Sequence, residues 1–132
     1  MNNFFEEVLT DGITDMVFVL KVVNNDEFQF QFINNAAKKR IGLLKDITGL
    51  SIKEVERRLD KAEFLYEQFR KVTISQTSFT YEDTYENMEE PQRKYYFETA
   101  LTPLMNKLGL VDRIVAVVRD ITKEKATLSS VK

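Results

Sequence analysis

Polar and apolar residues alternate along several stretches of the chain, and this alternation predicts β-strands. The first stretch, Met16 to Val23, is rich in β-branched and aromatic residues, and a polar turn follows it. In the next stretch Phe28, Phe30 and Phe32 alternate with glutamines. The pattern predicts an antiparallel hairpin whose second strand puts its three phenylalanines on one buried face.

A second group of alternating segments lies further along the chain. Phe79, Tyr81 and Tyr85 fall on one face of a strand, with polar residues between them. Residues 87–92 are polar and contain a proline, which is typical of a loop, and the alternation resumes over residues 95–101. A second hairpin is therefore expected.

The last strand is expected to lie inside the sheet. The run from Leu110 to Arg119 is apolar at consecutive positions over residues 114–118, which indicates that both faces are covered. Before it, Pro103 lacks a backbone N–H and predicts a strand end or edge, and residues 106–109 supply a turn.

The chain begins with a pattern typical of a short amphipathic helix. Asn3 and Glu6 have the spacing of a capping box, and the helix is expected to stop near Gly12. So short a helix must cover either the outer face of its own sheet or the same helix of a second chain, and we expect a dimer contact here. The apolar stripe that would make this contact is Phe4, Phe5, Val8 and Leu9.

Helical signals also fill the middle of the chain. Asn34 is a good N-cap for a helix over residues 36–41, and Gly42 is placed to end it. Ser51 and Asp60 each precede a glutamate by three residues, so both are interpreted as capping boxes. The second of these helices is expected to be the longest, with an apolar stripe of Ala62, Leu65, Tyr66, Phe69 and Val72.

The element order predicts an α+β domain: a five-stranded antiparallel sheet with short helices on one face and an N-terminal flanking helix. At 132 residues the chain fits one such domain. We expect residues 1–14 to form the flanking helix, residues 15–122 the domain, and residues 123–132 the start of an outgoing linker helix.

Four motifs resemble those of bacterial sensory-box PAS domains. They are Phe32-Ile33-Asn34-Asn35-Ala36-Ala37, Ile41-Gly42, Leu101-Thr102-Pro103-Leu104, and Arg119-Asp120-Ile121-Thr122 followed by a charged segment. The resemblance covers nearly the whole chain, and the order and spacing of the motifs are more specific than any motif alone.

The resemblance implies a signal-input module that senses a small ligand or mediates homodimerisation. Such modules precede an output domain, for example a histidine kinase of a two-component system, a diguanylate cyclase of cyclic-di-GMP signalling, or a transcription activator. Asp120 and Thr122 would then relay the signal by holding the last strand against the outgoing helix. An ordinary helix cap would use the same hydrogen bonds.

A ligand cavity and a filled hydrophobic core both fit the aromatic residues on the inner side of the sheet. The filled core is the simpler interpretation, because aromatic residues at these spacings usually just pack. If Tyr66, Tyr81 or Tyr95 pointed inward without a protein partner, a polar ligand or water would be needed. The candidate pocket residues are Phe30, Phe32, Ile41, Leu65, Phe69, Phe79, Tyr81, Phe97 and Ile114.

Composition excludes some chemistries. The chain has no cysteine and no histidine, which excludes a covalent flavin adduct and disfavours haem and zinc. A net charge of -2, with Lys38-Lys39-Arg40 as a basic cluster of only three residues, argues against nucleic acid. The absence of a long apolar run argues against membrane contact and favours a cytoplasmic location. No carboxylate lies in an apolar setting that would indicate catalysis, so the domain is not expected to be an enzyme; a small α+β enzyme is a remote alternative.

Overall fold

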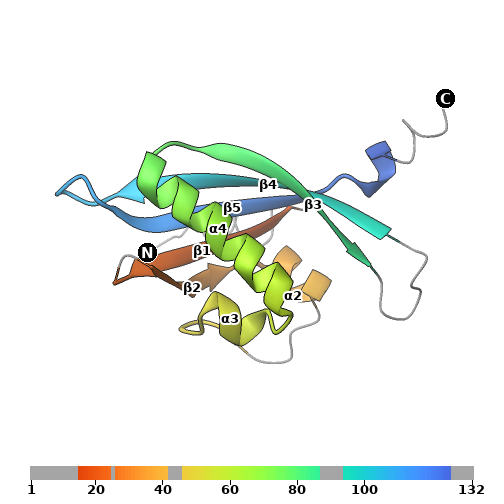
Figure 1. The fold of residues 1–132 in the computed structure, drawn as a ribbon. Coiled ribbons are helices and arrows are strands. Elements are labelled where there is room, and N and C mark those ends of the chain that lie inside the picture. Colours follow the sequence, from red (N-terminus) through yellow and green to blue (C-terminus); the bar gives the residue numbers. More distant parts are fainter. Residues whose placement is uncertain (1–14, 25, 42–45, 87–93, 126–132) are drawn as a thin grey trace, which may run out of the picture.

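The computed structural model describes residues 15–24, 26–41, 46–86 and 94–125, except for the side chains of Ile41 and Glu86. Five strands form one antiparallel sheet in the order β2-β1-β5-β4-β3 (Figure 1). Their bounds are β1 Met16–Val23, β2 Glu27–Ile33, β3 Phe79–Glu86, β4 Lys94–Met105 and β5 Val111–Asp120. The predicted α+β fold with this sheet is confirmed.

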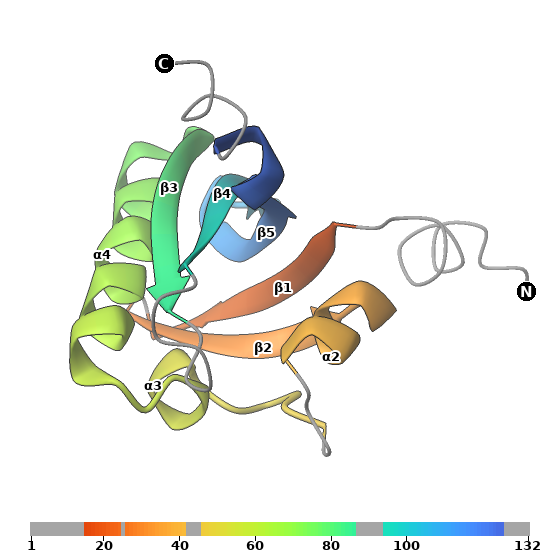
Figure 2. The ribbon, with the colours of Figure 1, turned by 90° about the vertical axis from the view of Figure 1, so that its right-hand side faces the viewer.

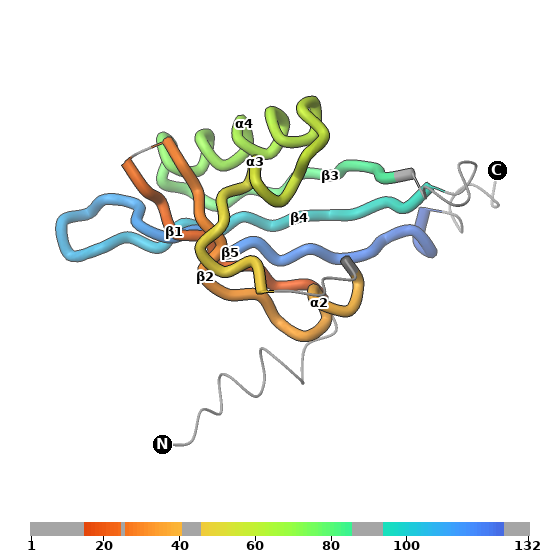
Figure 3. The backbone as a smooth tube through the Cα atoms, turned by 90° about the horizontal axis from the view of Figure 1, so that it is seen from below, coloured from red at the N-terminus to blue at the C-terminus, as the bar shows by residue number. Residues whose placement is uncertain are grey.

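Three helices lie between β2 and β3 in the sequence and cover the concave face of the sheet (Figure 2). They are α2 Asn35–Ile41, α3 Ile52–Val55 and α4 Leu59–Ser75. With 17 residues, α4 is the longest of these, as predicted, and it runs along the three strands β3, β4 and β5, which lie side by side (Figure 3). Its predicted apolar stripe faces inward, with Ala62, Phe69 and Val72 buried.

The central strand is β5, which pairs with β1 on one side and β4 on the other. This agrees with its apolar residues on both faces: Ile114 and Ala116 are buried on the inner face, and Val115 and Val117 are half-buried on the outer face. The predicted flanking helix, its dimer contact and the end of the first central helix at Gly42 lie outside the described residues, as does the loop at 87–92.

One predicted face is wrong because of a β-bulge. Leu20 pairs with Phe30 but its neighbour Val19 pairs with Phe32, so Gln31 is an extra residue in β2. The extra residue reverses the alternation, and it is Ile33, not Phe32, that joins Phe30 on the inner side. Phe32 therefore lies on the outer face, opposite Val19.

The predicted cap at Asp60 is corrected, and of the two alternatives for Pro103, a strand end or an edge, the structure shows the edge. Asp60 is not a cap, because α4 begins one residue earlier, at Leu59, with Arg58 in the N-cap position and no capping side chain. Pro103 does not end β4, which continues to Met105 and pairs with β5 there. It does lie at an edge, since β3 begins at Phe79, opposite Leu101, and no other strand of the described residues pairs with that side of β4 beyond Leu101.

The junction between β2 and α2 is held by the buried amide of Asn34. Its Oδ1 accepts from the backbone N–H of Ala37 in the first turn of α2, at 3.0 Å, and from that of Val17 in β1, also at 3.0 Å. Its Nδ2 donates to the carbonyl of Asp15. The predicted cap is confirmed, and the same side chain also fixes α2 to the neighbouring strand.

Candidate ligand-binding site

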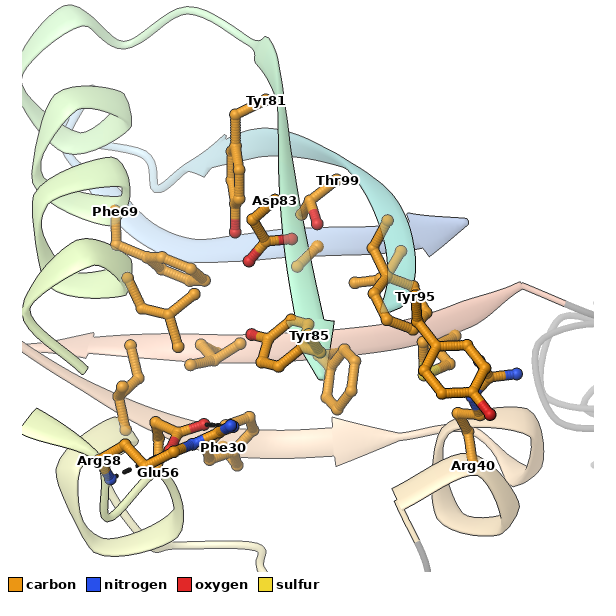
Figure 4. Close-up of a pocket in the computed structure, with 18 residues that line it drawn as sticks. Phe30, Arg40, Glu56, Arg58, Phe69, Tyr81, Asp83, Tyr85, Tyr95 and Thr99 are labelled. Atoms are coloured by element: carbon orange, nitrogen blue, oxygen red, sulfur yellow. Dashed lines mark hydrogen bonds and ion pairs between the residues drawn. The ribbon is translucent and has the colours of Figure 1, made fainter. Parts of the chain in front are cut away.

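A cavity of about 390 Å³ lies between the inner face of the sheet and the helices (Figure 4). This volume is in the range of small-molecule sites, which run from about 300 to 1,000 Å³. Aromatic and aliphatic side chains make up most of its wall. The lining residues are Met16, Phe18, Leu20, Phe30, Arg40, Ile52, Glu56, Arg58, Leu65, Phe69, Tyr81, Asp83, Tyr85, Tyr95, Phe97, Thr99, Ala116 and Val118.

The wall includes five of the nine side chains proposed from the sequence, namely Phe30, Leu65, Phe69, Tyr81 and Phe97. Phe79 and Ile114 pack instead in the hydrophobic core around Leu101 and Val111. The bulge turns Phe32 to the outer face, and the side chain of Ile41 lies outside the described residues. The aromatic residues therefore surround a space, which the filled-core interpretation did not anticipate.

The polar part of the wall was missed by the sequence analysis. Asp83 could have been found, because it lies midway between Tyr81 and Tyr85 and period two puts all three on one face. Arg40 and Arg58 could not, because Arg40 lies in the last turn of a short helix and Arg58 precedes α4, and neither position has a periodicity that points to the cavity.

The three inward residues of β3 bring ionisable groups into an apolar environment. Burial raises the pKa of the Asp83 carboxyl, while the charge of Lys61 and a hydrogen bond from Tyr85 act in the opposite direction. Burial likewise raises the pKa values of the Tyr81 and Tyr85 hydroxyls. In Figure 4, Asp83 lies near Tyr81 and Thr99 at one end of the cavity, and β-pairing sets Tyr81 directly opposite Thr99.

Both arginines of the wall are engaged by carboxylates. Arg58 makes two parallel hydrogen bonds of 2.8 Å to Glu56, and its guanidinium lies 5.2 Å from the centre of the Tyr85 ring. Arg40 donates to Asp120 at 2.7 Å, and its guanidinium lies 4.9 Å from the Tyr95 ring. Paired and stacked in this way, each arginine closes part of the wall.

Tyr66 has a protein partner and does not require a ligand. Its hydroxyl donates to Glu27 Oε1 at 2.5 Å and accepts from the backbone N–H of Lys53 at 3.4 Å. Burial and the hydrogen bond to Glu27 raise the pKa of Tyr66 to about 12. This contact ties α4 to β2 and to α3.

The motif Arg119-Asp120-Ile121-Thr122, where the chain leaves the sheet, is called the exit motif here. It joins β4, β5 and the helical turn at residues 122–125. Asp120 Oδ1 accepts from the backbone N–H of Thr122 at 2.9 Å, and Thr122 Oγ1 accepts from that of Tyr96 at 2.9 Å. Burial acts to raise the pKa of Asp120, but the hydrogen bonds from Thr122 and the charge of Arg40 outweigh it and the pKa is lowered. Ile121 is buried between these two contacts.

In the segments that the structure describes, no group of three or more His, Cys, Asp or Glu side chains could hold a metal ion. Within the same segments, no helix has the length and apolar character that crossing a membrane requires.

The architecture is that of a small α+β domain whose curved sheet encloses a cavity with its helices. The profile of the PAS domain family matches residues 14–123, and the chain belongs to this family. PAS domains are sensory modules and are generally not enzymes themselves. No curated protein matches the sequence.

Several solved structures share the fold at low sequence identity. A sensory box sensor histidine kinase from Vibrio cholerae has a TM-score of 0.64 at 17% identity, covering 89% of each chain. The N-terminal domain of a diguanylate cyclase with PAS/PAC sensor from Marinobacter aquaeolei has a TM-score of 0.63 at 10% identity, covering 84% of this chain and 98% of that one. VqmA bound to DPO has a TM-score of 0.69 at 17% identity, covering 86% of this chain and 55% of that one.

Proposed function

We propose that this PAS domain is a signal-input module that binds a small organic ligand in its cavity and relays occupancy to an output domain in the same polypeptide. The observation that carries the proposal is the position of Arg40. It lines the cavity and also pairs with Asp120, so one side chain contacts both the ligand space and the exit motif. A histidine kinase or a diguanylate cyclase is the output that the structural neighbours suggest.

The relay follows from the two contacts of Asp120. One carboxylate oxygen accepts from Arg40 and the other from the backbone of Thr122, where the outgoing helical turn begins. A ligand that displaces the Arg40 guanidinium would remove the first contact and leave the second to hold the turn alone. Because a ligand shifts an equilibrium only through contacts that differ between the two states, displacement of Arg40 from Asp120 would supply one such difference.

Ligand binding is tested by native mass spectrometry and absorption spectroscopy of gently purified protein. A bound molecule should appear as an added mass that is lost on denaturation. Ala116→Leu, which adds volume inside the cavity, should abolish the added mass, whereas Thr102→Leu on the outer face should retain it. Wild-type protein that carries no ligand and takes up none from a metabolite extract would refute the binding role.

The relay is tested in the full-length protein. Asp120→Ala combined with Thr122→Ala should uncouple input from output while the domain stays folded, since caps contribute only about 1 kcal/mol each. Glu124→Ala, an exposed change in the same helical turn, is the matched control. Normal signalling by the double variant would reject the coupling role.

A ligand-free dimerisation module is the second candidate, favoured by the outer face of the sheet. Val19, Phe32, Val115 and Val117 are all apolar and only half-buried there. Residues 1–10, with Phe4, Phe5, Val8 and Leu9, would provide the self-association contact. Deleting these residues should weaken dimerisation measured by light scattering; an unchanged self-association constant would exclude this contact.

A further inference from the structure

The cavity contains one carboxylate that lacks a partner of opposite charge among the described residues. Asp83 points inward from β3 between two tyrosines, and no ion pair joins it to another residue of the segments that the structure describes. The nearby Lys61 acts on it only through its charge, because the Lys61 ammonium donates to the carbonyl of Thr84 at 2.8 Å.

The cations of the cavity wall are not available to an anionic ligand without loss of an existing pair. Arg58 is held in a two-bond contact by Glu56, and Arg40 is held by Asp120. Planar two-bond contacts between arginine and carboxylate are among the stronger ion pairs in proteins. An incoming carboxylate or phosphate would therefore compete with a carboxylate already in place, whereas a donor group directed at Asp83 would break no ion pair and would compete only with the hydroxyl of Tyr85.

Aromatic rings surround Asp83 and suit a positively charged or N–H-bearing ligand. Tyr81 and Tyr85 flank it along β3, and Phe97 lies opposite it on β4, with the Tyr85 and Phe97 ring centres 5.6 Å apart. Aromatic faces attract cations through their quadrupole, and a partly buried carboxylate without a cationic partner is stabilised by a further hydrogen-bond donor. Both effects favour the same kind of ligand group.

We propose that the cavity selects small organic molecules with an apolar or aromatic body and one nitrogen donor, an ammonium or N–H group, that hydrogen-bonds to Asp83. This inference rests on the proposed function, since it requires a cavity that takes up a ligand. The body of the ligand would lie against other residues of the cavity wall, such as Phe30, Leu65 and Phe69.

Three naphthalene probes of similar shape test the proposal: 1-naphthylmethylamine, 1-naphthalenemethanol and 1-naphthaleneacetate. Their affinities for the wild-type chain are measured by isothermal titration calorimetry near neutral pH. The amine should bind at least about tenfold more tightly than the acetate, as expected for one charge-assisted hydrogen bond. Asp83→Asn should remove most of this preference and leave the affinity for the alcohol within about twofold.

Glu82→Gln is the matched control, because it makes the same carboxyl-to-amide change one residue away on the exposed outer face of β3. It should keep the wild-type preference for the amine. Two results would contradict the selectivity for a nitrogen donor: the alcohol binds but the amine and the acetate bind equally well, or Asp83→Asn keeps the preference for the amine. In either case the proposed ligand-binding role stands. If none of the three probes binds to the wild type or to Asp83→Asn, both the selectivity and the proposed ligand-binding role are overturned.

Discussion

The guanidinium of Arg40 donates to Asp120 Oδ2 at 2.7 Å and so joins two residues that are 80 positions apart in the sequence. Arg40 lies in the last turn of α2 and Asp120 ends β5, so the contact connects the helix that follows the first hairpin to the point where the chain leaves the sheet. The same guanidinium lies over the rings of Tyr95 and Phe97 on the cavity wall. The wall and the exit of the domain therefore share one ion pair.

The Arg40–Asp120 pair is expected to matter for coupling more than for stability. Both side chains are partly exposed, and exposed pairs contribute about 0–1 kcal/mol. Urea unfolding of Arg40→Ala, Asp120→Ala and the double variant should give a coupling energy in this range. Asp120→Ala alone should cost more, about 1 kcal/mol, because it also removes the acceptor for Thr122. A coupling energy above about 2 kcal/mol would mean that the pair is structural.

Asn34→Ala should be among the most destabilising single changes at a polar position. It leaves the buried N–H groups of Val17 and Ala37 without an acceptor, at about 1–3 kcal/mol each. Asn106→Ala is the control, since Asn106 Oδ1 also accepts from two backbone N–H groups, those of Leu108 and Leu110, but at an exposed turn that water reaches. Chemical denaturation should show the loss for Asn34→Ala to be at least twice that for Asn106→Ala, and equal losses would contradict the bridging role of Asn34.

Ser51→Ala and Asp60→Ala should differ although both residues begin a capping-box sequence. Ser51 Oγ accepts from the Glu54 N–H and Glu54 returns a contact to the Ser51 N–H, so removing the hydroxyl should cost about 1 kcal/mol. Asp60 lies inside α4 without a capping bond, and its loss should cost only a few tenths of a kcal/mol through the helix dipole. Thermal or urea unfolding distinguishes them, and a larger effect at Asp60 would place the start of α4 later than Leu59.

Asp83→Asn should stabilise the ligand-free domain near neutral pH. Burial raises the pKa of Asp83 above its ordinary 3.8, although Lys61 and Tyr85 oppose the shift, so the folded chain holds this proton more tightly than the unfolded chain. The wild type therefore loses stability as the pH rises from the ordinary carboxyl pKa through the raised pKa of the folded state. The asparagine variant has no proton to lose there, so its stability does not fall for this reason. Urea unfolding as a function of pH should show the advantage of the variant disappearing in acid below the ordinary carboxyl pKa. A wild type that is the more stable protein near neutral pH would contradict a buried, charged Asp83.

The local pattern of residues was sufficient for most of the elements. Alternation located the strands, and Phe79, Tyr81 and Tyr85 of β3 lie on one face of the sheet, as predicted. The Asn34 and Ser51 caps also followed from sequence, because a cap depends on residues three positions apart. The capping rule failed where the sequence allowed more than one start for a helix. Asp60 has the spacing of a capping box, yet α4 begins at Leu59.

What the sequence by itself determined is the element order, the inner face of most strands and the absence of cysteine and histidine chemistry. Only the tertiary structure decided that the aromatic residues surround a cavity, that Phe32 faces outward and that Arg40 meets Asp120. The physical reason is the range of the interactions. Strand period and helix capping act between near neighbours, whereas the bulge at Gln31, the curvature of the sheet and an ion pair across 80 residues depend on how distant segments pack.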